Sequence, residues 1–215
     1  MDSFREFCKT HDSSDEIKAY CEEHSNELDG DRIFQWSCVY KNLDIAKWSF
    51  YKVSSLCQSS TDINLWNERA LSISCSYGNL DIAQWLYSVG NVNIHANNEN
   101  AFRWSCTYGQ INAAQWLCSL GNVDIHADYD SAFRFSCAND HLDIAQWLYS
   151  LGNVNIRTGD DEAFRWSCNY HSPNVAQWLV SICSDYKIIS MSDEIIYKIN
   201  KFVWFKNTKL FLFIF

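Results

Sequence analysis

The sequence has little of what breaks or extends a chain: one proline and seven glycines in 215 residues, so we expect no long linkers. It has no run of Lys or Arg, and its formal net charge of -9 repels phosphate backbones and anionic lipid headgroups. No stretch approaches the roughly 18 apolar residues that span a bilayer. The polar, acidic start resembles neither a signal nor a transit peptide. These absences disfavour nucleic acid and membrane as partners.

Motifs of catalysis are also missing. There is no nucleophile elbow, no phosphate-cradling glycine loop and no HExxH. Cys137 and His141 are four residues apart, but the equivalent pair in another copy of the same segment is Cys106 with Gln110. We therefore expect no enzyme activity and no cofactor.

The ten cysteines do not form a disulfide pattern. Four of them recur at intervals of 31 residues, each in an apolar segment: Cys75, Cys106, Cys137 and Cys168. Packed helices lie about 8–10 Å apart, whereas bridged cysteines need Cα atoms within about 7 Å. Equivalent positions in neighbouring repeats therefore cannot pair. Buried free thiols predict a reducing, cytoplasmic location.

What the sequence does have is an internal repeat. Nearly identical segments begin at Ala70, Ala101, Ala132 and Ala163, and a looser copy begins at Ile33. The looser copy is followed by six extra residues around Lys52 to Asp62. The whole array therefore consists of one structural unit used several times.

The pattern within each unit predicts two helices. In the second half, Ile82, Trp85, Leu86 and Val89 follow the i, i+3, i+4, i+7 pattern of one helix face. Gly90 follows where a left-handed C-cap is easily made. The preceding segment, AFRWSC in the copy at Ala101, is apolar on nearly every side, as expected for a helix between neighbouring repeats. One such unit cannot close a core alone, so the units must stack.

The segment Gly78–Asn93, GNLDIAQWLYSVGNVN, resembles the second helix and following loop of an ankyrin repeat. AFRWSC then replaces the first helix of the family. The period is 31 rather than 33, and the turn glycine and helix-starting proline of the family are absent. The richness in Trp, Asn and Ile is similar to the ankyrin arrays of giant amoeba-infecting DNA viruses.

This resemblance implies an all-α, ankyrin-like helical-repeat solenoid with short extended or hairpin connections. It further implies a non-catalytic protein that binds another protein through its concave face and connections. We expect it to be monomeric and, if viral, to lie in the host cell cytoplasm.

The predicted organisation has three parts. Residues 1–32 form a degenerate N-terminal repeat, residues 188–215 a C-terminal capping half-repeat with an apolar tail, and residues 33–187 five repeats at about 33–66, 67–97, 98–128, 129–159 and 160–187.

Two sets of residues are candidates for binding a partner. A tyrosine column at the end of the first helix comprises Tyr40, Tyr77, Tyr108 and Tyr170. Tyr is enriched in binding hot spots, although its ring could equally cover the neighbouring repeat. The connections vary while the helices do not, which suits recognition but also a neutral loop. Their candidates are Asn97, Asn98, Asp128 and Tyr129.

Two further columns favour structural roles. The tryptophans lie on the apolar helix stripe and predict packing rather than a stacking platform: Trp48, Trp85, Trp116, Trp147 and Trp178. The arginines Arg103, Arg134 and Arg165 could bind an acidic partner. Acidic residues flank them, however, and internal hydrogen bonds between repeats are the favoured interpretation.

Two short motifs suggest alternatives. Cys8-x2-His11 and Cys21-x2-His24 carry ligand types suited to zinc, but Cys8 aligns with the cysteine column and the spacing matches no zinc module, so we expect no metal. Met191–Ile199 resembles the opening of an F-box, which would make the chain a ubiquitin-ligase substrate adaptor. The capping half-repeat explains the same residues.

Overall fold

A computed structural model describes residues 2–11, 13–24, 30–56, 60–90, 92–169, 172–191, 194–199, 202–205 and 208–213. Contacts divide the chain into two compact units. The first comprises residues 1–105 and 112–123, and the second comprises residues 106–111 and 124–215. No helix in the described part of the chain is long and apolar enough to cross a membrane.

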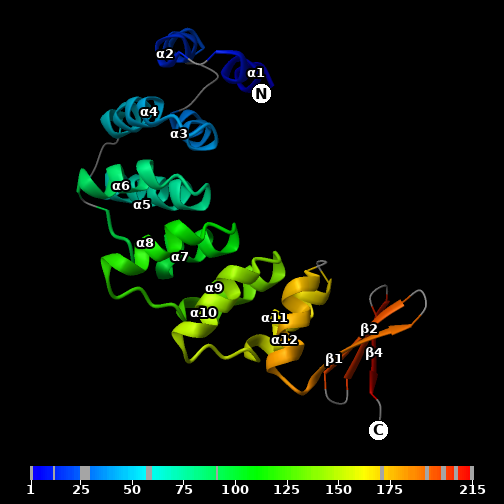
Figure 1. Ribbon diagram of the computed structural model, residues 1–215. Coiled ribbons are helices and arrows are strands. Elements are labelled where there is room, and N and C mark those ends of the chain that lie inside the picture. Colours follow the sequence, from blue (N-terminus) through cyan, green and yellow to red (C-terminus); the bar gives the residue numbers. More distant parts are fainter. Residues whose placement is uncertain are drawn as a thin grey trace. The chain divides into compact units, whose positions relative to one another are not determined.

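The helices follow one another along the sequence as pairs, each with a first and a second helix (Figure 1). They are α1 (Asp2–Thr10), α2 (Ser14–Glu23), α3 (Gly30–Val39), α4 (Leu43–Leu56), α5 (Ser60–Ser76), α6 (Leu80–Ser88), α7 (Ala96–Thr107), α8 (Ile111–Leu120), α9 (Ala127–Ala138), α10 (Leu142–Leu151), α11 (Thr158–Asn169) and α12 (Pro173–Ile182). From α1 to α12, this architecture confirms the prediction of an all-α helical-repeat solenoid. The described connections before Tyr186 contain no β-strand.

From α3 onward, each first helix buries a large apolar side chain, a serine and a cysteine. The apolar members are Phe34, Leu71, Phe102, Phe133 and Phe164. Burial of such a side chain stabilises the fold by about 1.5–3 kcal/mol. Alanine and aliphatic residues of the second helices, such as Ala83 and Leu86, face them in the core.

The buried serines form a column that the sequence reading missed. Each hydroxyl donates to the carbonyl three residues earlier, at 2.6–2.9 Å, from Ser37, Ser74, Ser105, Ser136 and Ser167. A small side chain that satisfies its own hydroxyl within the helix can be buried without an unpaired polar atom. This explains why serine precedes every cysteine of the column.

The six extra residues after the first full copy lengthen helices rather than a loop. α4 has 14 residues and α5 has 17, compared with 9 in α6 and 10 in α8. Residues 57–59 of this segment lie outside the described residues. The predicted C-cap at Gly90 is supported by a positive φ of 83°, whereas Gly152 combines a positive φ of 93° with a ψ of 160°, outside the left-handed helical region.

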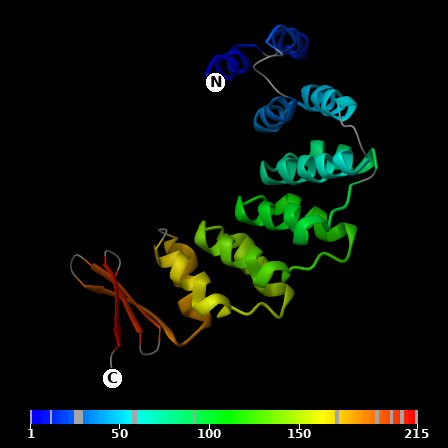
Figure 2. The same cartoon turned by 180° about the vertical axis from the view of Figure 1, so that it is seen from behind.

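Residues 186–213 form four antiparallel strands in the order β1-β2-β3-β4 (Figure 2). They are β1 (Tyr186–Met191), β2 (Glu194–Ile199), β3 (Phe202–Phe205) and β4 (Thr208–Phe213). The capping half-repeat expected from residue 188 is therefore not the structure of this segment. Ile, Tyr, Phe, Val and Trp dominate it, and these β-branched and aromatic residues favour strands. The F-box-like segment Met191–Ile199 lies in β1 and β2, apart from residues 192 and 193, which lie outside the described residues.

Tyr186 closes the last helix pair. Its ring lies parallel to that of Phe164, with centroids 4.3 Å apart, and its hydroxyl donates to Asp161 at 2.5 Å. Burial, the largest cause, raises the pKa of this phenol well above its usual range, and the Asp161 carboxylate adds to the effect. A buried aromatic side chain at the start of β1 thus covers the end of the repeats, where a helical cap was expected.

Candidate functional site

The first turns of α7, α9 and α11, as bounded above, contain three consecutive residues in a left-handed conformation. Their φ angles are 54–59°, 56–58° and 55–65° at residues 97–99, 128–130 and 159–161. A left-handed conformation costs an ordinary L-residue roughly 1–2 kcal/mol. Asn, Asp and Gly tolerate it best, and they occupy seven of the nine positions, the others being Glu99 and Tyr129. The composition of the variable connections therefore has a conformational cause.

An acidic side chain ends each left-handed turn, and in the first two turns it is buried. Glu99 and Asp130 are 6% and 7% exposed. The Nδ1 atom of His95 lies 2.8 Å from Glu99 Oε1, and Nδ1 of His126 lies 2.6 Å from Asp130 Oδ1. The main chain closes the same four-residue loop, because the Asp130 amide donates to the His126 carbonyl at 3.1 Å. In the third copy Arg157 pairs with Asp161 at 3.7 Å.

The arginine column completes the support of these turns. Arg103 donates to the Asn98 carbonyl at 3.2 Å, and Arg165 donates to the Asp160 carbonyl at 3.2 Å. Arg134 donates to the carbonyls of Tyr129 and Asp128 at 2.8 and 3.0 Å. These bonds support a structural role for the column, although each of them lies within one repeat and not between repeats as expected.

Asp130 and Arg134 also join neighbouring repeats. Thr158 donates to Asp130 Oδ2 at 3.2 Å, and Arg134 forms an ion pair with Glu162. Thr158 and Glu162 belong to α11, 28 residues further along the chain. The turn at residues 128–130 is thus tied to α11 of the next repeat.

The predicted connection residues lie on these anchored turns with their side chains exposed. Asn97, Asn98 and Asp128 are exposed, and Tyr129 has an exposed fraction of 79%. The ring of Tyr129 is exposed to solvent, and the side chain of Arg134 donates a hydrogen bond to the Tyr129 carbonyl. An ordered backbone that presents exposed side chains loses little conformational entropy on binding.

The tyrosine column is only partly exposed. Tyr77 and Tyr108 have exposed fractions of 46% and 50%. Tyr40 is half-buried, with its ring 5.8 Å from that of Trp36. Tyr170 lies outside the described residues. The expectation that these rings face a partner therefore suits Tyr77 and Tyr108 better than Tyr40.

Two exposed aromatic residues of the first helices were missed. Trp104 and Phe135 have exposed fractions of 43% and 37%. The sequence reading placed AFRWSC between neighbouring repeats and so treated its tryptophan as buried. The i, i+4 spacing from Trp104 to Tyr108 puts both on one helix face and could have indicated their exposure.

The tryptophans of the second helices are half-buried and pack edge-on between repeats. Trp85 meets Phe50, Trp116 meets Tyr87 and Trp178 meets Tyr149, with centroids 5.2–6.0 Å apart and interplanar angles of 82–90°. This is a favoured geometry for aromatic pairs. The packing interpretation is supported for these three, although the column lies at the rim of the core rather than inside it.

The two Cys-x2-His motifs place their histidines in an aromatic stack. The rings follow in the order His11, Phe7, Tyr20 and His24, with successive centroids 3.9, 4.2 and 4.1 Å apart. Each histidine Nδ1 also hydrogen-bonds a carbonyl of its own helix, at Phe7 and Tyr20. Stacking of helices α1 and α2 therefore explains the shared spacing. In the described residues no three potential metal ligands come together.

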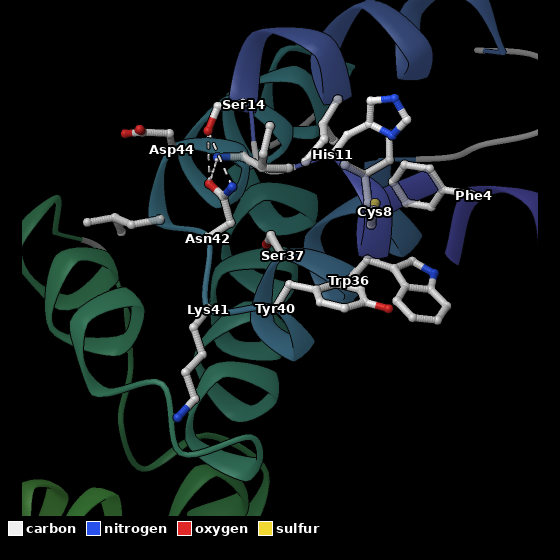
Figure 3. A pocket seen from close by; sticks show the side chains of 14 residues that line it. Phe4, Cys8, His11, Ser14, Trp36, Ser37, Tyr40, Lys41, Asn42 and Asp44 are labelled. Atoms are coloured by element: carbon white, nitrogen blue, oxygen red, sulfur yellow. Dashed lines mark hydrogen bonds between the residues drawn. The ribbon is translucent and has the colours of Figure 1, made fainter. Parts of the chain in front are cut away.

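A pocket of about 550 Å³ lies between α1, α2 and the pair α3 and α4 (Figure 3). Phe4, Trp36 and Tyr40 line it, and Ser14 and Asn42 hydrogen-bond to each other across its edge at 3.3–3.4 Å. The chain from Cys8 to Ile17 is two residues longer than the equivalent chain in later repeats.

Residues 36–129 match the family model of ankyrin repeats (3 copies). Among solved structures, the chain is similar to an ankyrin repeat family protein from Legionella pneumophila, at 15% identity and a TM-score of 0.46. The similarity covers 74% of this chain and 49% of that one, so it spans about half of the length of the relative. No curated protein matches the sequence. These comparisons support neither a giant-virus origin nor an F-box.

Proposed function

We propose that this chain binds another protein through the exposed residues of its left-handed turns and of the first helices. Ankyrin repeats in general mediate contacts between proteins. The observation that carries the proposal is Tyr129, 79% exposed on a turn whose carbonyls are held by Arg134. Nothing in the fold requires an aromatic ring in solvent at this position, whereas Tyr supplies contact area with few rotatable bonds.

Site-specific photo-crosslinking tests this surface. A benzophenone amino acid replaces Tyr77, Tyr108 or Tyr129 in the full chain. The matched controls carry it at Gln84, Gln115 or Gln146, which are exposed at equivalent positions of the second helices. We expect a discrete crosslinked protein from the tyrosine positions and none from the glutamine positions. Equal crosslinking from both sets would refute the proposed surface.

We propose a non-catalytic role. The cysteine thiols, which would be the strongest nucleophiles, are protonated at neutral pH, because burial raises the pKa of Cys8 and of Cys118 to about 11 and that of Cys21 to about 12. An alkylation rate at Cys118 comparable to that of a free thiol at pH 7 would contradict this expectation.

We also propose that the chain works as a monomer in the cytoplasm, without binding nucleic acid or membrane. The nine free cysteines of the described residues suit a reducing compartment. The net charge of -9 suits a protein that remains apart from phosphate-rich surfaces. Sedimentation as a dimer would overturn the monomeric state, and retention on a DNA column at about 150 mM salt would overturn the absence of nucleic-acid binding.

A further inference from the structure

The second unit carries an exposed aromatic surface beside a left-handed turn. The rings of Phe135 on α9 and Trp166 on α11 lie 5.3 Å apart. The Arg134 guanidinium lies 6.0 and 5.7 Å from their centroids and donates to the carbonyls of Asp128 and Tyr129. One side chain therefore ties the turn to the aromatic pair. We call Asp128, Tyr129, Phe135 and Trp166 the α9 surface.

The chain around this surface is strongly acidic. Residues 124–185 contain nine Asp or Glu residues and three arginines. Each arginine binds an internal acceptor: Arg134 pairs with Glu162, Arg157 with Asp185, and Arg165 donates to the Asp160 carbonyl. The side chains of Asp128 and Asp160 are exposed. The field at the surface of the turns is consequently negative.

The position of Arg134 shows that the ring faces of Phe135 and Trp166 accept a cation. A guanidinium over the faces of Phe135 and Trp166 makes a cation–π contact, a geometry that favours Arg and Lys over neutral side chains. Tyr129 presents another aromatic face to solvent on the same turn. Together with the negative field, these rings fit a partner that brings positive charge and apolar stems.

We propose that the α9 surface docks a basic segment of the partner protein. Arg or Lys heads of that segment meet Asp128 and Asp160, and their aliphatic stems lie on the rings of Tyr129 and Phe135. This inference rests on the proposed protein-binding function and specifies its partner chemistry. It concerns the second unit alone.

The probe is a fluorescent 15-residue peptide of five Arg-Leu-Gly repeats, and its charge-reversed control has five Glu-Leu-Gly repeats. Binding to the full chain is measured by fluorescence anisotropy at 50 and 300 mM salt. We expect the basic peptide to bind, more weakly at high salt, and the acidic peptide not to bind.

Two double variants with the same change in net charge separate local docking from general attraction. One carries Asp128→Asn and Asp160→Asn on the turns, where asparagine tolerates positive φ. The other carries Asp81→Asn and Asp143→Asn in the first turns of α6 and α10. We expect about fivefold weaker peptide binding for the first and less than about twofold for the second, because each exposed ion pair contributes at most about 1 kcal/mol.

A Tyr129→Ala variant tests the aromatic contribution and should weaken binding by about fivefold without a change in net charge. Equal losses in the two aspartate variants, or equal binding of the acidic peptide, would overturn a basic partner at this surface. The protein-binding function would survive that result if the tyrosine positions still crosslink. Loss of that crosslinking contrast would remove the function itself.

Discussion

Replacement of one of two aspartates in the same left-handed turn tests how the connection is held. Asp130 is buried and its carboxylate accepts from His126 and Thr158, whereas Asp128 is exposed two residues earlier. Asp130→Asn and Asp128→Asn make the same chemical change. Both keep a residue that tolerates the φ of 56° found at each position. The pair therefore isolates burial and hydrogen bonding from backbone preference.

The magnitude follows from the two hydrogen bonds. A bond to a charged group contributes about 1.5–3 kcal/mol and a neutral bond about 0.5–1.5 kcal/mol. Neutralising Asp130 weakens two bonds, so Asp130→Asn should cost about 2–3 kcal/mol. Asp128→Asn should change the free energy of unfolding by less than about 0.5 kcal/mol, as is usual at exposed positions.

The assay is urea unfolding at pH 7, monitored by tryptophan fluorescence and by circular dichroism. Thr158→Val, alone and combined with Asp130→Asn, adds a double-mutant cycle whose coupling should exceed about 0.5 kcal/mol. Equal costs for the two asparagine variants would refute the argument. So would a cost below about 0.5 kcal/mol for Asp130→Asn, because the buried carboxylate would then not stabilise the turn.

Three further outcomes are expected. Burial raises the pKa of Cys38 and Cys75 from the ordinary 9.0 to about 12, so the folded state favours the neutral thiols. Their contribution to the free energy of unfolding is complete below pH 9 and is lost as the pH rises toward 12. The urea midpoint should fall across that range, and Cys75→Ala should make the fall shallower. A double-mutant cycle to alanine on Tyr87 and Trp116 should give a coupling of about 0.5–1.5 kcal/mol for their edge-on contact, and additivity would contradict it. Tyr186→Phe should cost about 1–3 kcal/mol through the lost bond to Asp161, whereas Tyr186→Ala should cost about 3–5 kcal/mol; equal effects would show that the ring stack contributes nothing.

The exposure of the candidate binding residues was predictable in part. Exposure of Tyr77, Tyr108 and Tyr129 agrees with the choice of these positions as contacts. Trp104 and Phe135 were missed because a segment that is apolar on most faces gives no sign of which face meets solvent. The connection was expected to be extended or a hairpin. Its left-handed turns carry a local signal in their Asn, Asp and Gly residues, and the sequence analysis did not use it.

The sequence alone determined the elements that repeat. Local periodicity gives the 31-residue period, the helix pairs, the glycines at the helix ends and the buried cysteine column. Residues three and four apart in the sequence lie on the same face of a helix, so one repeat is enough to show that face. The tertiary structure decided what lies between the helices and after them. Asp130 meets Thr158, and Arg134 meets Glu162, across 28 residues of chain. Tyr186 replaces the expected helical cap by packing on Phe164. Contacts between residues this far apart depend on how the repeats pack, and packing is what separates a supporting aspartate from an exposed one in the same turn.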